Sequence, residues 1–162
     1  AYETGELWIH GANVVPGYWN RPAATAAAIQ EGWFRTGDLA YLDDEGFVYI
    51  VDRAKDVLIR GGENVYSAEV EAAIYGNPCV ADAAVIGIPD LEMGEEVAAV
   101  VRLHAGCDAS EDTIRAAVAA KLAAFKVPKY IFFHPEPLPR NAAGKLLKRQ
   151  LREEMVSRLV QE

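Results

Sequence analysis

Cysteine is scarce in this sequence of 162 residues, which contains only Cys79 and Cys107. The two lack the C-x-x-C spacing of zinc and redox sites, and the three histidines are isolated from them and from one another. Such a pair favours free thiols in an intracellular, cytoplasmic protein, with one disulfide bridge as the alternative. We therefore expect neither a disulfide framework nor a metal site built by this chain.

Long apolar runs are also missing. None approaches the roughly 18 to 20 residues that a membrane-spanning helix needs. Residues 1–5 carry neither the basic nor the apolar region of a signal peptide, and no methionine begins the chain. We therefore expect no integral membrane segment, and we expect the sequence to be part of a longer protein.

Basic residues are outnumbered, because 16 Lys and Arg face 24 Asp and Glu and give a net charge of −8. This balance argues against a protein that binds nucleic acid with its whole surface. The charge is unevenly spread: residues 61–112 hold eleven acidic residues and one basic residue, whereas residues 121–152 hold eight basic and one acidic. A basic segment of this kind can attract an anionic ligand locally, although a solvated surface is its commoner meaning.

The remaining composition is that of an ordinary globular protein, with 51% apolar residues, 25% charged residues, 13 glycines and 8 prolines. It does not match a disordered chain, a collagen-like fibre or a small disulfide-rich protein. A chain of this length can form one full-sized domain or two small ones.

The first third of the sequence predicts a β-rich piece. Leu7 and Ile9 alternate with their neighbours between two glycines, which is typical of a half-buried strand. Pro22 opens an alanine-rich stretch, and proline is well tolerated in a first helical turn. The expected elements are a strand at 7–10, a helix at 22–29, a short strand at 33–36 that stops before Gly37, a turn at 43–46 and a strand at 47–51.

Residues 52–56 form a charged break between two apolar runs, so we place a domain boundary there, with residues 1–51 before it and 52–162 after it. The second part mixes strands and helices without strict β-α-β alternation, which indicates a small α+β domain. Its expected elements are a helix with Ser67 as N-cap that ends before Gly76, strands at 80–88 and 97–103, a helix capped by Ser110, a strand at 130–133, a loop at 135–144 and a last helix with Leu147, Leu151, Met155 and Leu159 at intervals of four.

Three stretches are unusual for a mere scaffold. In the first, Asp38 follows Gly37, and a carboxylate at a strand end can accept hydrogen bonds from a vicinal diol such as a ribose. An ordinary turn is the alternative. In the second, at 52–71, the pair Gly61-Gly62 permits close approach of a ligand to the backbone. Arg53, Lys55 and Arg60 flank this glycine pair and could meet phosphate, while a hairpin turn with solvated charges explains the same residues equally well.

The third stretch, at 139–145, places Lys145 directly after Gly144 on a loop between apolar elements. A lysine in such a position can be delivered into a site elsewhere in the protein. A solvated lysine is the commoner alternative, and this stretch alone does not decide between them.

The order of the three stretches resembles the C-terminal part of the adenylate-forming superfamily, which includes acyl-CoA synthetases, firefly-type luciferases and peptide-synthetase adenylation domains. The resemblance covers nearly the whole chain and is carried by GELWIHGANVVPGYWNRPAAT, GWFRTGDLAYLDDEGFVYIVDRAKD and LPRNAAGKLLKRQLRE. It implies that residues 1–51 are the β-rich end of a large AMP-binding domain. Residues 52–162 would then be a small mobile α+β lid, with a short β-hairpin and a small sheet flanked by helices.

The resemblance also implies a two-step reaction. A carboxylate attacks ATP to give an acyl-adenylate and pyrophosphate, and a thiol, usually of CoA, then displaces AMP; Mg²⁺ accompanies ATP and is bound mainly outside these residues. Asp38 would hold the ribose hydroxyls of ATP or AMP, and Arg53 would sit by the ribose and phosphate. Lys145 would be the catalytic residue that reaches the α-phosphate and the acyl carboxylate during adenylation.

Two further roles follow from the same resemblance. Lys55 occupies the hinge about which the lid rotates between the two steps. Gly61, Gly62 and Glu63 would face the pantetheine tunnel of CoA after that rotation. The Gly-Gly-Glu-Asn string resembles fatty-acid and related CoA ligases, so we expect a fatty or related carboxylic acid and CoA as substrates, in fatty acid metabolism.

Two alternatives stay open. The chain could belong to an adenylation domain that loads a carrier protein, or it could be a non-catalytic α+β module that binds a partner through the basic segment 121–152. In the favoured interpretation the phosphate loop and the acyl pocket lie in a preceding N-terminal domain. We therefore expect the isolated chain to be inactive without that domain.

Overall fold

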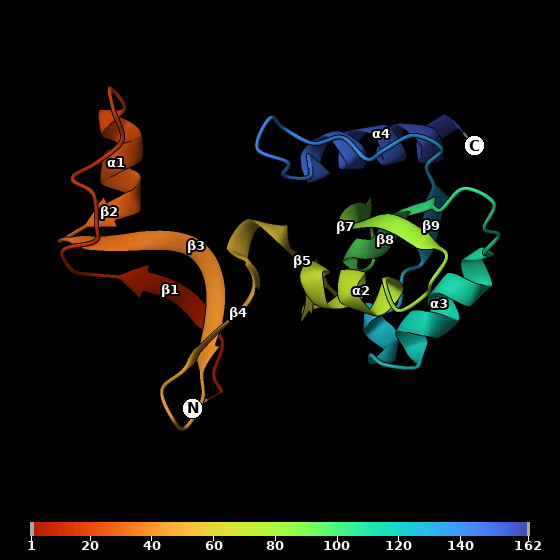
Figure 1. The fold of residues 1–162 in the computed structure, drawn as a ribbon, viewed down its shortest axis with the longest axis horizontal. Coiled ribbons are helices and arrows are strands. Elements are labelled where there is room, and N and C mark those ends of the chain that lie inside the picture. Colours follow the sequence, from red (N-terminus) through yellow and green to blue (C-terminus); the bar gives the residue numbers. More distant parts are fainter. Residues whose placement is uncertain (1, 162) are drawn as a thin grey trace. The chain divides into compact units, whose positions relative to one another are not determined.

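A computed structural model describes residues 2–161, which form two compact units, residues 2–55 and residues 56–161 (Figure 1). The division falls between Lys55 and Asp56, four residues after the predicted boundary. The difference arises because Asp52 and Arg53 still pair with the preceding strand and so belong to the first unit.

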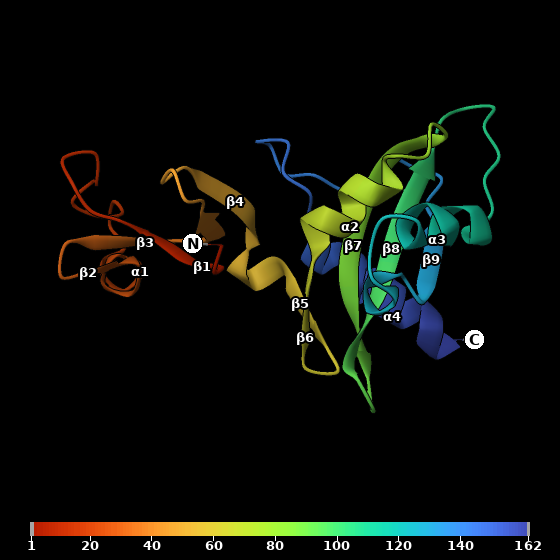
Figure 2. The same ribbon diagram turned by 90° about the horizontal axis from the view of Figure 1, so that it is seen from below.

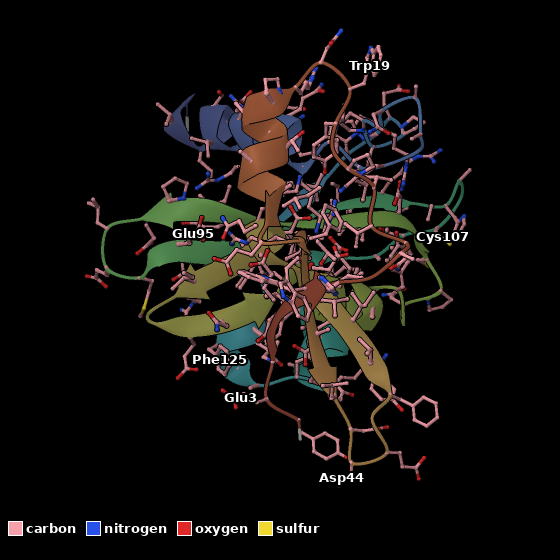
Figure 3. All side chains as sticks on the ribbon, turned by 90° about the vertical axis from the view of Figure 1, so that its left-hand side faces the viewer. Glu3, Trp19, Asp44, Glu95, Cys107 and Phe125 are labelled. Carbon is pink, nitrogen blue, oxygen red and sulfur yellow. The ribbon has the colours of Figure 1, made fainter. Side chains whose placement is uncertain are left out.

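The first unit is a small antiparallel sheet with one helix. Its central strand, β3, pairs with all three other strands. Asp43 closes the turn between β3 and β4 by accepting hydrogen bonds from the amides of Glu45 and Phe47, and Asp44 lies at the tip of this turn (Figure 3). The elements are β1 (Gly5–Ile9), α1 (Pro22–Ala28), β2 (Ile29–Gln30), β3 (Trp33–Leu42) and β4 (Val48–Arg53).

The prediction that a short strand stops before Gly37 is wrong, because β3 continues to Leu42. The reason is a β-bulge. Opposite β1, the register moves by two residues on β1 but by four on β3, and Gly37 lies in this interval with φ of 72°. A glycine with positive φ absorbs the extra residues of a bulge without ending the ladder. Asp38 is therefore in the middle of a strand and not at its end.

The second unit is a five-stranded sheet covered by helices on both faces. Strand β8 is central and pairs antiparallel with β7 and β5 and parallel with β9. Figures 1 and 2 show α4 on one face and α2 and α3 on the other. The elements are β5 (Val57–Arg60), β6 (Glu63–Tyr66), α2 (Ser67–Ile74), β7 (Val80–Asp90), β8 (Gly94–Leu103), α3 (Glu111–Ala119), β9 (Tyr130–Phe133) and α4 (Lys148–Gln161), with short 3-10 helices at Ala54–Asp56 and Ala124–Lys126.

Each face of this sheet has its own hydrophobic core. Val85 of β7 points to the core shared with α2 and α3, while its neighbour Ile86 points to the core shared with α4. Successive side chains of a strand point to opposite faces, so the continuous apolar run of β7 fills both cores. The α+β class is confirmed.

The local predictions for helices have mixed outcomes. Ser110 caps α3, because its hydroxyl accepts a hydrogen bond from the Thr113 amide at 3.3 Å. The interval of four in the last helix is confirmed for Leu151 and Met155, which are fully buried. It is wrong for Leu147, which precedes the first residue of α4 and is 36% exposed. The prediction for Ser67 is wrong: it is the first residue of α2, and its hydroxyl accepts a hydrogen bond from Lys148 at 2.7 Å.

Two further sequence expectations can be compared with the structure. Cys79 and Cys107 are free thiols, so the bridge is not formed. Across residues 2–161, every helix is too short or too polar to cross a membrane.

Candidate functional site

Asp38 and Arg53 are brought together in the first unit. They are paired residues of β3 and β4, and the Arg53 Nε donates to Asp38 Oδ1 at 2.9 Å. The Arg53 amide also donates to Asp52 Oδ1 at 2.7 Å, which holds the backbone of Arg53 in place. Both paired side chains are partly exposed, so a carboxylate able to accept hydrogen bonds from a diol lies beside a guanidinium able to donate to a phosphate or ribose oxygen.

Thr36 orients Asp38, and the sequence analysis gave this threonine no role. Its hydroxyl donates to the Leu7 carbonyl at 2.8 Å and accepts from the Asp38 amide at 3.0 Å. This bridge spans the bulge at Gly37 and fixes the direction in which the Asp38 side chain leaves the strand. Only the pairing of β1 with β3 reveals it, since Leu7 is distant in sequence.

Lys55 lies in the 3-10 helix Ala54–Asp56, at the junction of the two units. Its side chain is exposed and bonds to none of the residues from 2 to 161. A short, exposed 3-10 segment between two compact units has the location that a hinge requires. Its role as a hinge stays a prediction.

Gly61 and Gly62 form the two-residue turn between β5 and β6, in which Arg60 pairs with Glu63. Their φ angles are 57° and 87°. Positive φ at both positions is typical of the type I′ hairpin turn, so the hairpin alternative describes the backbone correctly. The Gly61 amide donates to the Met93 carbonyl at 2.9 Å. A β-carbon added at Gly62 would meet no other described residue within 4 Å, apart from the chain neighbours. A ligand can therefore still approach this backbone closely.

Arg60 anchors the turn and is not a free ligand for phosphate, contrary to one of the two predictions for it. Its guanidinium forms two hydrogen bonds with the buried carboxylate of Glu96, at 2.6 and 3.1 Å. Glu96 raises the pKa of Arg60, as expected for a charge-assisted pair. Lys129 contacts Glu96 at 3.5 Å and Asp90 at 3.2 Å, so this end of the sheet is held by a network of four charges.

Lys145 lies on a loop whose backbone is internally bonded. The side chain of Asn141 accepts from the amides of Ala143 and Lys145, both at 3.0 Å, and the Asn141 amide donates to the Lys145 carbonyl at 2.9 Å. Gly144 has φ of 78°, a conformation that favours glycine. The Lys145 ammonium is exposed and makes no hydrogen bond or ion pair with residues 2–161. The loop therefore presents a free cation on a well-defined backbone.

Arg140 and Lys148 hold the two ends of this loop, and the sequence analysis assigned neither a role. Arg140 is paired with Asp82 of β7, which raises the pKa of the arginine. Lys148 forms an ion pair with Glu71 of α2 at 2.7 Å. Their partners lie far away in the sequence, so no local pattern could have identified them.

The predicted residues of the second unit do not converge on one point. Figure 2 shows the β5–β6 turn and the loop before α4 at opposite ends of the sheet. Lys145 and the Gly61–Gly62 turn therefore cannot act on the same atoms from one position of this unit. Within residues 2–161, no three His, Cys, Asp or Glu side chains are grouped to hold a metal ion.

Comparison with known proteins identifies the family. The sequence model of the AMP-binding enzyme C-terminal domain matches residues 69–145. The chain is 50% identical over 151 residues to a 2-succinylbenzoate–CoA ligase of Geobacillus kaustophilus, and 46% identical over 153 residues to a long-chain-fatty-acid–CoA ligase of Bacillus subtilis. The chain belongs to the adenylate-forming superfamily.

The alignments cover most of this chain but a minor part of each relative. They span 93% and 94% of this chain, and 31% and 27% of the two ligases. The solved structure of o-succinylbenzoate CoA synthetase from Bacillus subtilis, in complex with an acyl-adenylate intermediate, matches with a TM-score of 0.88 and 44% identity over 93% of this chain and 31% of that one. The resemblance seen in the sequence motifs is confirmed.

Proposed function

We propose that this chain is the C-terminal part of an AMP-forming acid–CoA ligase. The observation that carries the proposal is the Lys145 loop, which presents an unpaired ammonium on a backbone held by Asn141. Catalysis of attack on a phosphate needs positive charge placed in advance where negative charge gathers. The relatives named as CoA ligases favour CoA as the acceptor over the carrier-protein and interaction-module alternatives.

The first step joins the acid to the nucleotide. A carboxylate oxygen of the acid attacks the α-phosphorus of ATP, the bond to the β-phosphate oxygen breaks, and pyrophosphate leaves. Mg²⁺ would accompany ATP and would be held mainly outside these residues. In this step Asp38 accepts hydrogen bonds from the ribose hydroxyls and Arg53 donates to ribose or phosphate oxygen. Lys145 stabilises the charge that develops between the acid and the α-phosphate.

The second step transfers the acyl group. The sulfur of CoA attacks the acyl carbon of the adenylate, the bond to the phosphate oxygen breaks, and AMP leaves. We assign Gly61, Gly62 and Glu63 to the passage of the pantetheine arm, because the turn leaves the backbone open to close approach at Gly62. Rotation about Lys55 would move the end of the second unit that carries Lys145 away from the reacting atoms. It would bring the end that carries this turn to them instead.

The substrate class in this proposal is a carboxylic acid in general. Relatives named for 2-succinylbenzoate, long-chain fatty acids and ferulate all match this chain at 46 to 50% identity. The expectation of fatty acid metabolism is therefore broadened to carboxylic acids in general, because relatives named for chemically different acids match this chain about equally well.

Substitution of Lys145 by alanine in the full-length ligase tests the proposal. We expect the single-turnover rate of pyrophosphate release to fall by roughly 10²- to 10³-fold, the usual cost of removing one preorganised charge. Formation of the thioester from supplied acyl-adenylate and CoA should be retained. Arg149→Ala is the matched control, since Arg149 is exposed and pairs only with Glu153 one helical turn away. Equal loss of both steps in the Lys145 variant would contradict the assignment.

A further inference from the structure

Arg140 forms hydrogen bonds on both sides of its guanidinium. Its Nη2 donates to both carboxylate oxygens of Asp82, each at 2.8 Å, and its Nη1 donates to the Gly144 carbonyl at 2.9 Å. That carbonyl belongs to the peptide group that joins Gly144 to Lys145. One arginine therefore connects strand β7 to the peptide immediately before the lysine.

The same peptide group is held from its other side. Its amide hydrogen, on Lys145, is donated to Asn141 Oδ1 at 3.0 Å. Both polar atoms of the Gly144–Lys145 peptide thus have a fixed partner. Asn141 lies within the loop and moves with it, whereas Asp82 lies on the sheet. Arg140 is the contact that ties this peptide to the body of the unit.

Asp82 is a rigid anchor. Its side chain is only 14% exposed, and it also accepts a hydrogen bond from the Tyr75 hydroxyl at 2.9 Å. The Tyr75 oxygen and Asp82 Oδ1 both accept from the Ala83 amide, at 3.1 and 3.0 Å. The carboxylate is therefore fixed by the end of α2 and by β7 before Arg140 reaches it.

The base of the loop is closed by a β-bridge between Arg140 and Leu146 and by the Leu147 amide, which donates to the Pro139 carbonyl at 2.9 Å, and Leu146 packs against the core under α4. The tip of the loop has little to hold it. Ala142, Ala143 and Gly144 are small and exposed, and they contribute no packing that would set the position of the backbone. The lysine that follows has a long, flexible side chain with no partner of its own among residues 2–161. On the Gly144 side of Lys145, where no packing contributes, the bond from Arg140 is therefore the contact that sets where the Lys145 side chain begins.

We infer that Arg140 is a positioning residue for the adenylation step, because its bonds to Asp82 and to the Gly144 carbonyl fix the base of the Lys145 side chain relative to the sheet. This inference rests on the proposed function. A displacement of a charged group by about 1 Å can cost on the order of 10²-fold in rate. The guanidinium of Arg140 is engaged by Asp82 and the Gly144 carbonyl, so in this inference its effect passes through Lys145.

The test uses Arg140→Gln in the full-length ligase, measured by single-turnover release of pyrophosphate and, separately, by thioester formation from supplied acyl-adenylate and CoA. We expect adenylation to fall by about 10- to 100-fold, as a misplaced lysine would cause, and thioester formation to change by less than about 2-fold. Arg140→Lys should give an intermediate rate, because one ammonium can keep the ion pair with Asp82 but lacks the fork that also reaches the Gly144 carbonyl.

Arg152 provides a matched control. It too bonds one carbonyl and one carboxylate, Gly87 at 2.7 Å and Glu95 at 3.0 Å, and its side chain is 45% exposed against 42% for Arg140. It has no bond to the Lys145 loop. Arg152→Gln should therefore leave the rate of adenylation unchanged while removing a comparable set of bonds. A loss in Arg140→Gln no greater than that in Arg152→Gln overturns the inference.

A double variant separates positioning from general stability. In a Lys145→Ala background, Arg140→Gln should lower adenylation no further, since the group that it positions is already gone. A further loss of 10-fold in the double variant would show that Arg140 acts elsewhere. If Lys145→Ala itself leaves adenylation intact, the proposed function fails. If Lys145→Ala slows adenylation and Arg140→Gln does not, only the present inference fails.

Discussion

The two units bury their apolar side chains to very different extents. The second unit has two separate cores, whose members include fully buried Val100, Ile114 and Leu151. Of residues 2–55, only Ala40 is a buried apolar side chain, while Phe47 and Ile50 are 61% and 65% exposed. Burial of apolar surface is the main favourable term in folding. The second unit therefore buries enough apolar surface to be stable by itself, and the first unit does not.

The candidate functional residues follow the same contrast. In the first unit, Asp38 and Arg53 lie within a strand ladder and face each other directly. In the second unit, Lys145 and the Gly61–Gly62 turn lie on loops at the ends of a well-packed sheet (Figure 2). A rigid scaffold with functional groups on its loops suits a part that moves as a body. The Asp38–Arg53 pair, held within the β3–β4 ladder, suits residues that keep contact with their ligand.

The largest expected effect is a difference in folding between the units produced separately. Residues 56–162 should unfold cooperatively in urea, with a free energy of unfolding of about 5–15 kcal/mol, the usual range for a domain. Residues 1–55 should show no cooperative transition by circular dichroism. A sharp transition in the shorter piece would break the comparison, since it would reveal stability that the buried residues do not explain.

The junction between the units supplies the next prediction. Proline has φ near −65°, which is also typical of residues in a 3-10 helix, so Lys55→Pro should hold the junction in one conformation. In the proposed mechanism adenylation precedes the binding of CoA, so pyrophosphate release should keep a near-normal rate. Transfer of the acyl group to CoA should slow by at least ~10-fold, a barrier increase of about 1.4 kcal/mol.

Lys55→Ala is the control for the lost charge and should leave both steps near normal. Wild-type rates for both steps in the proline variant would show that the hinge is not at Lys55. In that case the rotation, and with it the functional boundary between the units, would have to be placed elsewhere.

The smallest expected effect concerns the β7–β8 hairpin of the second unit. The amides of Met93 and Glu92, and then Lys129, lower the pKa of Asp90 from its ordinary value of 3.8. A lowered pKa in the folded state means that the ionised carboxylate adds stability above about pH 3.8, which is lost as the pH falls through the folded value. Asp90→Asn should therefore lower the urea midpoint of residues 56–162 slightly at pH 7, and the difference from wild type should shrink at pH 3. An unchanged difference at pH 3 would show that Asp90 acts by its shape and not by its charge.

Several features of the fold follow from local patterns in the sequence. The interval of four in the last helix selects the buried face that holds Leu151 and Met155, and Ser110 caps its helix through a residue only three positions away. The turn at 43–46 is closed by Asp43 and residues within four positions of it. Periodicity and capping act over one or two turns of chain, so the sequence alone determines them at these positions. Ser67 is the exception, because its hydroxyl accepts from Lys148, which is distant in sequence.

The motifs around Asp38, Arg53 and Lys145 could also be recognised in the sequence, because their order along the chain resembles that of the adenylate-forming superfamily. The backbone conformation around these motifs could not be predicted from the sequence. The sequence predicts that a strand stops before Gly37. Pairing with β1 instead places Gly37 in a β-bulge, and the strand continues beyond it.

Tertiary structure alone decided the partners of the charged residues. Arg60 meets Glu96 across 36 residues, Arg140 meets Asp82 across 58, and Lys148 meets Ser67 across 81. A basic residue in a sequence rich in acids has many possible partners, and nothing local distinguishes a solvated arginine from one that holds a loop. The choice is made by strand register and helix packing, which bring one particular carboxylate within hydrogen-bond distance and leave the Lys145 ammonium free.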